Sequence, residues 1–151
     1  MEQGLPKEAL ALTPVFVFGT LKAGFPNAGS NPGLRLEGDF VTGEAYPLYL
    51  VGDRHSPWLV AQPGHGFPVS GEVYLVTAEQ LARMDSLERV DQPDGYRRQR
   101  VRLRRVERPD EWFEADAYLK PLEQLLGADI REGPLAEYLP EHALLYRRRG
   151  S

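Results

Sequence analysis

The sequence predicts an α+β protein built on a small, mainly antiparallel β-barrel flanked by a few helices. Three observations lead to this class. Most segments have the composition of short strands, separated by turns rich in glycine and proline. One capped helix near the middle of the chain interrupts them, and two long strands follow it. This order lacks the strict strand–helix alternation of a doubly wound fold.

Composition and length are those of one globular domain. The 151 residues are 42% hydrophobic and 26% charged. We expect residues 14–151 to form a single domain and residues 1–13 to be a loose lead-in. The absence of cysteine excludes disulfides and thiol chemistry, so a cytoplasmic location is the simplest expectation. A net charge of −4 gives no general attraction to nucleic acid, and no apolar run reaches the roughly 18 residues of a membrane helix.

The first strand is expected at residues 15–18, which are all β-branched or aromatic, as in a strand covered on both faces. Gly19 ends it. The backbone N–H groups of Gly19, Thr20 and Leu21 would then lie in a turn, where successive N–H groups suit a carboxylate or an oxyanion. Lys22 adds a nearby positive charge. On composition alone, an ordinary strand and turn is the simpler interpretation.

Loops and strands alternate in the next part of the chain. Glycine, proline and asparagine make residues 24–33 a loop that could border the same cavity as the turn. Residues 36–51 have an extended pattern. Further strands are expected at 58–60 and 69–76, separated by turns at 52–57 and 62–68.

A single helix is predicted with a defined start. Thr77 is a good N-cap, and Gln80 lies three residues later, as in a capping box. Leu81, Met84 and Leu87 then recur on one face.

The remaining segments are two long strands and a weakly patterned end. Residues 96–106 alternate between apolar residues (Val101, Leu103) and arginines, and residues 112–119 can pair with them as a hairpin. Helical turns are expected at 122–126 and 135–139, and a basic tail at 146–151.

Glu88 falls inside the apolar stripe of the predicted helix. A carboxylate on the core side of a helix is unusual, and the dipole at a helix C-terminus disfavours negative charge. Both effects favour the protonated carboxyl and so suit proton transfer near neutral pH. In the alternative interpretation the helix ends at Leu87, and Glu88 turns into water or pairs with Arg83 or Arg89.

Other candidate residues point less clearly to chemistry. The three histidines, His55, His65 and His142, are far apart, so we expect neither a metal nor a cofactor. The arginines of the long strand suit a half-exposed strand face as well as a nucleic-acid surface. Tyr96 could line a pocket or belong to the core.

Several motifs in order resemble the γ-glutamylcyclotransferase-like family, and within it the γ-glutamylamine cyclotransferase branch. The resemblance covers roughly residues 14–119. Residues 15–22 are similar to the Tyr-Gly-Ser/Thr-Leu signature that opens these proteins. The other matching stretches are Tyr46-Pro47-Leu48, Pro57-Trp58-Leu59, Gly71-Glu72-Val73-Tyr74, Met84-Asp85-Ser86-Leu87-Glu88 and Tyr96-Arg97-Arg98.

This resemblance implies a small barrel with a substrate cavity at Phe18, Gly19, Thr20 and Leu21, and Glu88 as the catalytic residue. The reaction would convert a γ-glutamyl amine or isopeptide fragment to 5-oxoproline and a free amine. It implies a small-molecule γ-glutamyl substrate. From the charge and hydropathy given above we expect no nucleic acid and no membrane as a partner, and we expect no cofactor. The family usually has tyrosine where this chain has Phe18.

Two other functions stay open at this point. One is a non-catalytic small-molecule binding domain on the same barrel, for which the loss of the tyrosine hydroxyl at Phe18 would be the mark. The weaker one is nucleic-acid binding through the arginine strand. The sequence leaves the released amine and the oligomeric state open.

Overall fold

A computed structural model of the protein describes residues 12–148. The expected lead-in, residues 1–13, lies outside the described residues except for its last two, and so does the end of the basic tail. The first strand begins at Thr13.

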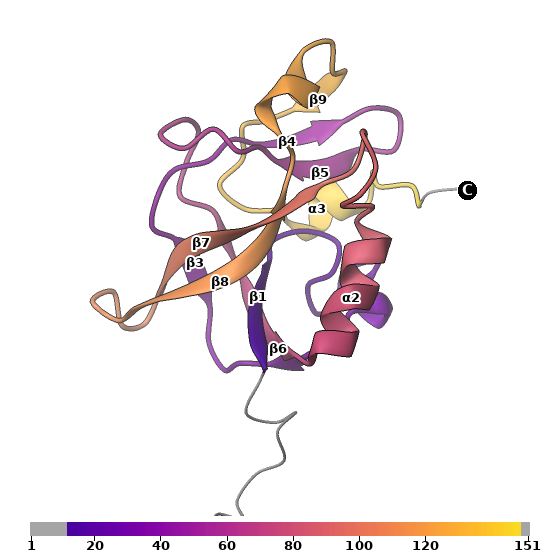
Figure 1. Ribbon diagram of the computed structural model, residues 1–151. Coiled ribbons are helices and arrows are strands. Elements are labelled where there is room, and N and C mark those ends of the chain that lie inside the picture. The colour runs from indigo at the N-terminus through magenta and orange to yellow at the C-terminus, as the bar shows by residue number, and fades with distance from the viewer. Residues whose placement is uncertain (1–11, 149–151) are drawn as a thin grey trace, which may run out of the picture.

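Strands dominate the described chain, as Figure 1 shows. The strands are β1 (Thr13–Val17), β2 (Leu34–Arg35), β3 (Phe40–Thr42), β4 (Leu48–Val51), β5 (Ser56–Leu59), β6 (Ser70–Val76), β7 (Arg97–Arg105), β8 (Trp112–Leu119) and β9 (Ile130–Glu132). The helices are α2 (Ala78–Leu87) and α3 (Pro140–Ala143), with short 3-10 helices η1 (Ala28–Ser30) and η2 (Leu122–Leu125).

Within residues 12–148, five strands close a barrel in the order β1-β8-β7-β3-β6. The antiparallel pairing of β6 with β1 completes the ring, and the short strand β2 pairs with Tyr74 and Leu75 of β6. Every pairing is antiparallel except β1 with β8, which is parallel. The predicted fold, a mainly antiparallel barrel flanked by helices, is confirmed.

A second sheet, β5-β4-β9, lies beside one end of the barrel (Figure 1). It was not predicted. The extended region at 36–51 divides between the two sheets, because β3 pairs within the barrel whereas β4 pairs with β5 and β9. All three residues of β9 are exposed, so this strand carries no apolar pattern that a sequence could display.

The first strand is buried on both faces, as predicted. Phe16 packs inside the barrel with residues of the other strands. Val15 and Val17 point the opposite way and pack with Met84 of α2 and with Tyr118 of β8. Consequently β1 joins the barrel interior to the helix outside it, and its C-terminal end is held from both sides.

Helix α2 has the predicted capping box. Thr77 accepts a hydrogen bond from Gln80 N at 3.1 Å, and Gln80 Oε1 accepts one from Thr77 N at 2.9 Å. The helix packs on the barrel mainly through Met84, and it ends at Leu87, whose side chain is 46% exposed. None of the helices in the described part of the chain is long and apolar enough to cross a membrane.

The hairpin of β7 and β8 and the alternation of apolar residues and arginines along β7 are as predicted. Val101 and Leu103 are buried. The alternate arginines lie outside and find partners there: Arg98 and Arg100 both bond to Asp116, and Arg102 stacks 4.0 Å above the Trp112 ring. This face therefore carries its own counter-charges.

The C-terminal region departs from the prediction. The 3-10 helix η2 lies where a helical turn was expected, but the turn predicted at 135–139 is wrong. That segment is not helical: Leu135 N bonds to Leu48 O at 2.8 Å, and Tyr138 is fully buried. The helix α3 begins one residue later, at Pro140, where the fixed φ of proline suits a first helical position.

Replacing Thr77 with alanine should lower the free energy of unfolding by about 1 kcal/mol, because the N-terminal N–H groups of α2 lose their cap. Chemical denaturation measures this change. Thr77→Ser is the matched control and should retain most of the stability, since it keeps the hydroxyl. Equal losses in the two variants would show that the methyl group, not the cap, is what matters.

Candidate active site

A cavity of about 970 Å³ opens where β1 ends. Its lining includes all five residues that the sequence singled out: Phe18, Gly19, Thr20, Leu21 and Glu88. The first four come from the turn after β1, and Glu88 follows α2. The packing of β1 against α2 thus brings these two distant stretches to one cavity.

The turn after β1 has one fixed shape because its carbonyl groups are all engaged. Gly19 O accepts from Lys22 N at 3.1 Å, and Thr20 O accepts from Asn27 N at 2.8 Å. Leu21 O accepts from the Asn31 side chain at 3.2 Å. The loop at residues 24–33 therefore supports the turn, in agreement with its expected position beside the cavity.

Glycine is required at position 19 by close packing and not by a positive φ. A Cβ atom built there would lie 2.8 Å from Cγ of Pro57, a second cavity residue. The turn and β5 thus approach each other at a distance that only glycine permits.

Lys22 does not supply the positive charge expected beside the turn. Its side chain is buried, its Nζ donates to Tyr138 O at 2.7 Å, and it lies 4.4 Å from the centre of the Phe25 ring. Burial lowers the pKa of this amine. Lys22 instead anchors the segment before α3 through Tyr138.

Phe18 forms part of the cavity wall. Its side chain is 8% exposed and packs with the barrel core, and its ring centre lies 6.4 Å from that of Phe16. The ring therefore has a packing role that does not need a hydroxyl.

Glu88 is the C-cap of α2, and its backbone is held on both sides. Its N–H donates to Met84 O at 2.9 Å, and its carbonyl accepts from Tyr96 N at 3.0 Å. The helix ends at Leu87, as the alternative interpretation assumed. However, Glu88 is half-buried and lines the cavity.

The two arginines considered as partners of Glu88 have other ion pairs. Arg83 pairs with Glu79 at 3.3 Å, and Arg89 pairs with Asp94 at 2.8 Å. The second of these pairs closes the loop that follows Glu88.

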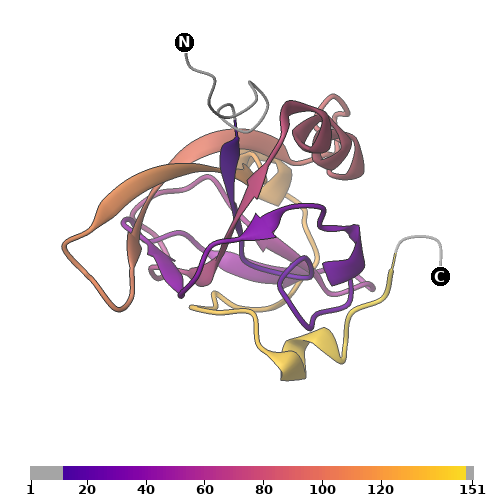
Figure 2. The same cartoon turned by 90° about the horizontal axis from the view of Figure 1, so that it is seen from below.

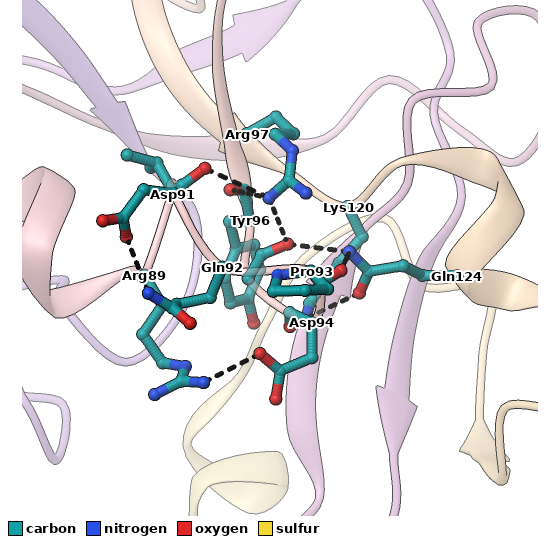
Figure 3. A network of polar contacts seen from close by, with 11 residues as sticks. Arg89, Asp91, Gln92, Pro93, Asp94, Tyr96, Arg97, Lys120 and Gln124 are labelled. Carbon is teal, nitrogen blue, oxygen red and sulfur yellow. Dashed lines mark hydrogen bonds and ion pairs between the residues drawn. The ribbon is translucent and has the colours of Figure 1, made fainter.

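A dense polar network holds this loop, residues 88–96, in place (Figure 3). From one side, the Arg97 guanidinium donates to the carbonyls of Val90, Gly95 and Tyr96 at 3.0–3.3 Å. From the other side, Lys120 Nζ donates to Asp94 O at 2.7 Å. The side-chain amide of Gln124 bonds to the carbonyls of Pro93 and Gly95 at 3.0 and 2.9 Å.

Gly95 is indispensable to the shape of this loop. A Cβ atom at this position would lie 1.7 Å from Arg89 O, which no side chain can tolerate. Arg89 itself adopts a left-handed conformation, with φ of 56°. The loop is thus folded tightly on itself directly after Glu88.

Another part of the cavity wall is aromatic and carries the buried cation of Lys120. Tyr96 OH donates to Pro57 O at 2.9 Å, and both residues line the cavity, so Tyr96 serves as pocket wall and packing residue together. Lys120 Nζ lies 4.4 Å from the Trp58 ring centre and 4.5 Å from that of Tyr96. Sequence reasoning missed Lys120, although a lysine directly after an apolar strand was a signal.

Tyr118 brings a second polar network to the cavity. Its hydroxyl donates to Asp85 Oδ1 at 2.7 Å, and Arg98 bridges Asp85 and Asp116 at 2.9 and 2.8 Å. Burial and then the hydrogen bond to Asp85 raise the pKa of Tyr118, so this hydroxyl remains a protonated donor. Through Asp85, the Tyr118 hydroxyl holds the last turn of α2, which directly precedes Glu88.

Between residues 12 and 148, no group of three His, Cys, Asp or Glu side chains could hold a metal ion. His142 is buried, and its Nδ1 accepts from Leu139 N at 2.9 Å, which caps α3.

Comparison with known proteins identifies the family. The family described as gamma-glutamyl cyclotransferase, AIG2-like, matches residues 15–137. The chain belongs to this family, as the motifs predicted.

Similar proteins of known name and structure agree with this assignment. The chain is 41% identical over 109 residues to the gamma-glutamylaminecyclotransferase of Bos taurus, covering 68% of this chain and 64% of that protein. It is 39% identical over 100 residues to the Homo sapiens protein of the same name, covering 62% and 63%. The matches thus span a little under two thirds of these relatives. The crystal structure of an AIG2-like protein from Mus musculus, 30% identical, superposes with a TM-score of 0.75 over 93% of this chain and 98% of that one.

Replacing Gly95 with alanine should lower the free energy of unfolding by about 3 kcal/mol or more, because the loop after Glu88 cannot admit a methyl group. Thermal or chemical unfolding measures the loss. Gly29→Ala is the control: a Cβ atom there meets nothing within 4 Å, so this variant should remain near wild-type stability. A Gly95→Ala protein as stable as Gly29→Ala would contradict the described loop conformation.

Proposed function

We propose that the protein is a γ-glutamyl cyclotransferase that converts a γ-glutamyl amine to 5-oxoproline and a free amine. The observation that carries this proposal is the meeting of Glu88 with the turn of Gly19, Thr20 and Leu21 on one cavity. The names of the relatives support the same reaction class.

The reaction needs little from the protein beyond positioning and proton transfer. The α-amine nitrogen of the γ-glutamyl group attacks its own γ-carbonyl carbon and forms the ring bond. The bond from that carbon to the leaving nitrogen then breaks, and the leaving amine departs with an added proton. Because attack is intramolecular, a cavity that holds the chain bent can contribute about 7–11 kcal/mol to lowering the barrier.

Glu88 is proposed as the proton carrier. Its carboxylate accepts a proton from the substrate ammonium, which frees the attacking lone pair, and later donates a proton to the leaving amine. The backbone of Glu88 at the end of α2 is hydrogen-bonded to Met84 O and to Tyr96 N. This supports the role because a rigid backbone holds the carboxyl in position.

The turn after β1 is proposed as the anchor of the substrate. The N–H groups of Gly19, Thr20 and Leu21 would bind a carboxylate or the developing oxyanion, and the ring of Phe18 would pack against the glutamyl chain. The buried position of Phe18 supports a role in cavity shape, so loss of the tyrosine hydroxyl is compatible with turnover.

The other functions have less support. The outward arginines of β7 are engaged by Asp85, Asp116 and Trp112, which offsets the positive charge that nucleic acid would need.

We place the reaction in the cytoplasm because the sequence has no cysteine.

Replacing Glu88 with glutamine should reduce release of 5-oxoproline by about 10²–10⁴-fold, because the amide cannot carry the proton. Turnover is measured by chromatography on a panel of γ-glutamyl amines. Glu79→Gln is the matched control, since Glu79 lies on the same helix in an exposed ion pair with Arg83.

Both variants should unfold at the wild-type temperature, which separates chemistry from folding. Unchanged turnover in Glu88→Gln would refute the assignment of the catalytic residue. Binding of 5-oxoproline by the wild-type protein, with no turnover of any compound in the panel, would instead establish a binding domain.

A further inference from the structure

The segment that follows α3 forms part of the cavity wall. We call Tyr146, Arg147 and Arg148 the C-terminal strap. Tyr146 and Arg148 line the cavity. All three residues lie beyond the part of the chain that matches the family, residues 15–137, so the family match assigns them no role. Figure 2 shows the yellow C-terminal segment passing beside the indigo loop that carries η1.

The C-terminal strap joins two segments that are distant from each other in sequence. Arg147 N donates to Arg54 O at 2.9 Å, and Arg54 Nε donates to Arg147 O at 3.1 Å, which ties the strap to the connection between β4 and β5. In addition, the Arg148 guanidinium donates to Pro26 O in the loop at residues 24–33. The strap is therefore held beside the loop that supports the turn after β1.

The hydroxyl of Tyr146 meets this loop at Asn27. Its oxygen accepts from Asn27 Nδ2 at 3.1 Å and from Arg54 Nη2 at 3.4 Å. The Arg54 guanidinium also lies 5.8 Å from the centre of the Tyr146 ring. Because donors from two segments hold the Tyr146 oxygen, Asn27 has an acceptor in a fixed position.

Asn27 in turn holds Thr20 at two atoms. Its backbone N donates to Thr20 O at 2.8 Å, and its side-chain Nδ2 donates to Thr20 Oγ1 at 3.0 Å. A side-chain amide nitrogen carries two hydrogens, and here one goes to Thr20 and the other to Tyr146. The Tyr146 hydroxyl therefore fixes the rotation of the Asn27 amide, and with it the contact to the Thr20 hydroxyl.

This arrangement makes the Thr20 hydroxyl a donor toward the cavity. Its oxygen accepts from Asn27, so its own hydrogen is directed to another partner. Thr20 is half-buried and lines the cavity. A hydroxyl beside successive backbone N–H groups of one turn gives a set of donors that suits a carboxylate.

We propose that Tyr146 is a positioning residue for the substrate: through Asn27 it directs the Thr20 hydroxyl to donate a hydrogen bond to the carboxylate of the glutamyl group. This inference rests on the proposed cyclotransferase function, in which the turn after β1 anchors that group. It makes the C-terminal strap a working part of the site, although the strap lies outside the motifs that identify the family.

Replacing Tyr146 with phenylalanine removes only this hydroxyl and tests the role. The KM for a γ-glutamyl amine should rise about three- to tenfold, because the Thr20 donor loses its fixed direction. The kcat should stay near the wild-type value, since the glutamyl carboxylate is bound alike in the ground state and in the transition state. Steady-state release of 5-oxoproline measures both constants.

Binding of 5-oxoproline locates the contact. This product keeps the glutamyl carboxylate and lacks the leaving amine, so its Kd, measured by calorimetry, should rise in Tyr146→Phe by the same factor as KM. A rise in KM without a rise in this Kd would refute the assignment to the glutamyl carboxylate.

A second substitution separates positioning from general support by the C-terminal strap. Thr20→Val removes the hydroxyl that Asn27 holds and keeps the size of the side chain. In the Thr20→Val background, Tyr146→Phe should leave KM unchanged, since no hydroxyl remains to be directed. The same rise in KM in both backgrounds would contradict a role that acts through Thr20.

Tyr49→Phe is the matched control, because it removes a tyrosine hydroxyl from β4 at a position outside the cavity lining. It should keep the wild-type KM and Kd. An unchanged KM in Tyr146→Phe would overturn the positioning role and leave the cyclotransferase proposal intact. Failure of the wild-type protein to release 5-oxoproline from any γ-glutamyl amine would overturn the cyclotransferase proposal, and this inference with it.

Discussion

The candidate site depends on one backbone hydrogen bond, which joins the two ends of the loop after α2. Tyr96 N bonds to Glu88 O, and Gly95 lets the loop pass so close to Arg89 O that no side chain fits. This hydrogen bond fixes Glu88 at the end of the helix and positions Tyr96 directly before β7. Lys120, which follows the last barrel strand, holds the same loop from the other side. A helix terminus, usually a fraying element, thus becomes a rigid support for a carboxylate.

The barrel supplies the second half of the arrangement. Its first strand is covered inside by the barrel core and outside by α2, so the turn after β1 and the end of α2 are positioned by the same packed residues. Gly19 then brings this turn against Pro57, whose carbonyl holds the Tyr96 hydroxyl. The walls of the cavity are therefore joined to one another by short-range contacts, which suits a reaction that requires a bent substrate.

Local patterns predicted the parts of the fold that depend on local forces. The capping box of α2 and the alternating burial of β7 follow from neighbouring residues, so they were readable. The segment at 135–139 was misread as helical because the backbone N–H of Leu135 bonds to Leu48 of β4, which is distant in sequence. Lys22 was misplaced for the same reason: its amine turns away from the cavity to Tyr138, 116 residues later.

The sequence by itself determined the family, the barrel class and the five residues proposed for chemistry and anchoring, because short motifs and periodic patterns carry that information. Only the tertiary structure decided that these residues share a cavity. It also decided that Glu88 faces that cavity from the C-cap of a helix that ends one residue earlier. Arg54 and Arg148 line the same cavity, and only the tertiary structure shows this. The physical reason is that a cavity is made by contacts between distant segments, and such contacts leave no periodic trace in the chain.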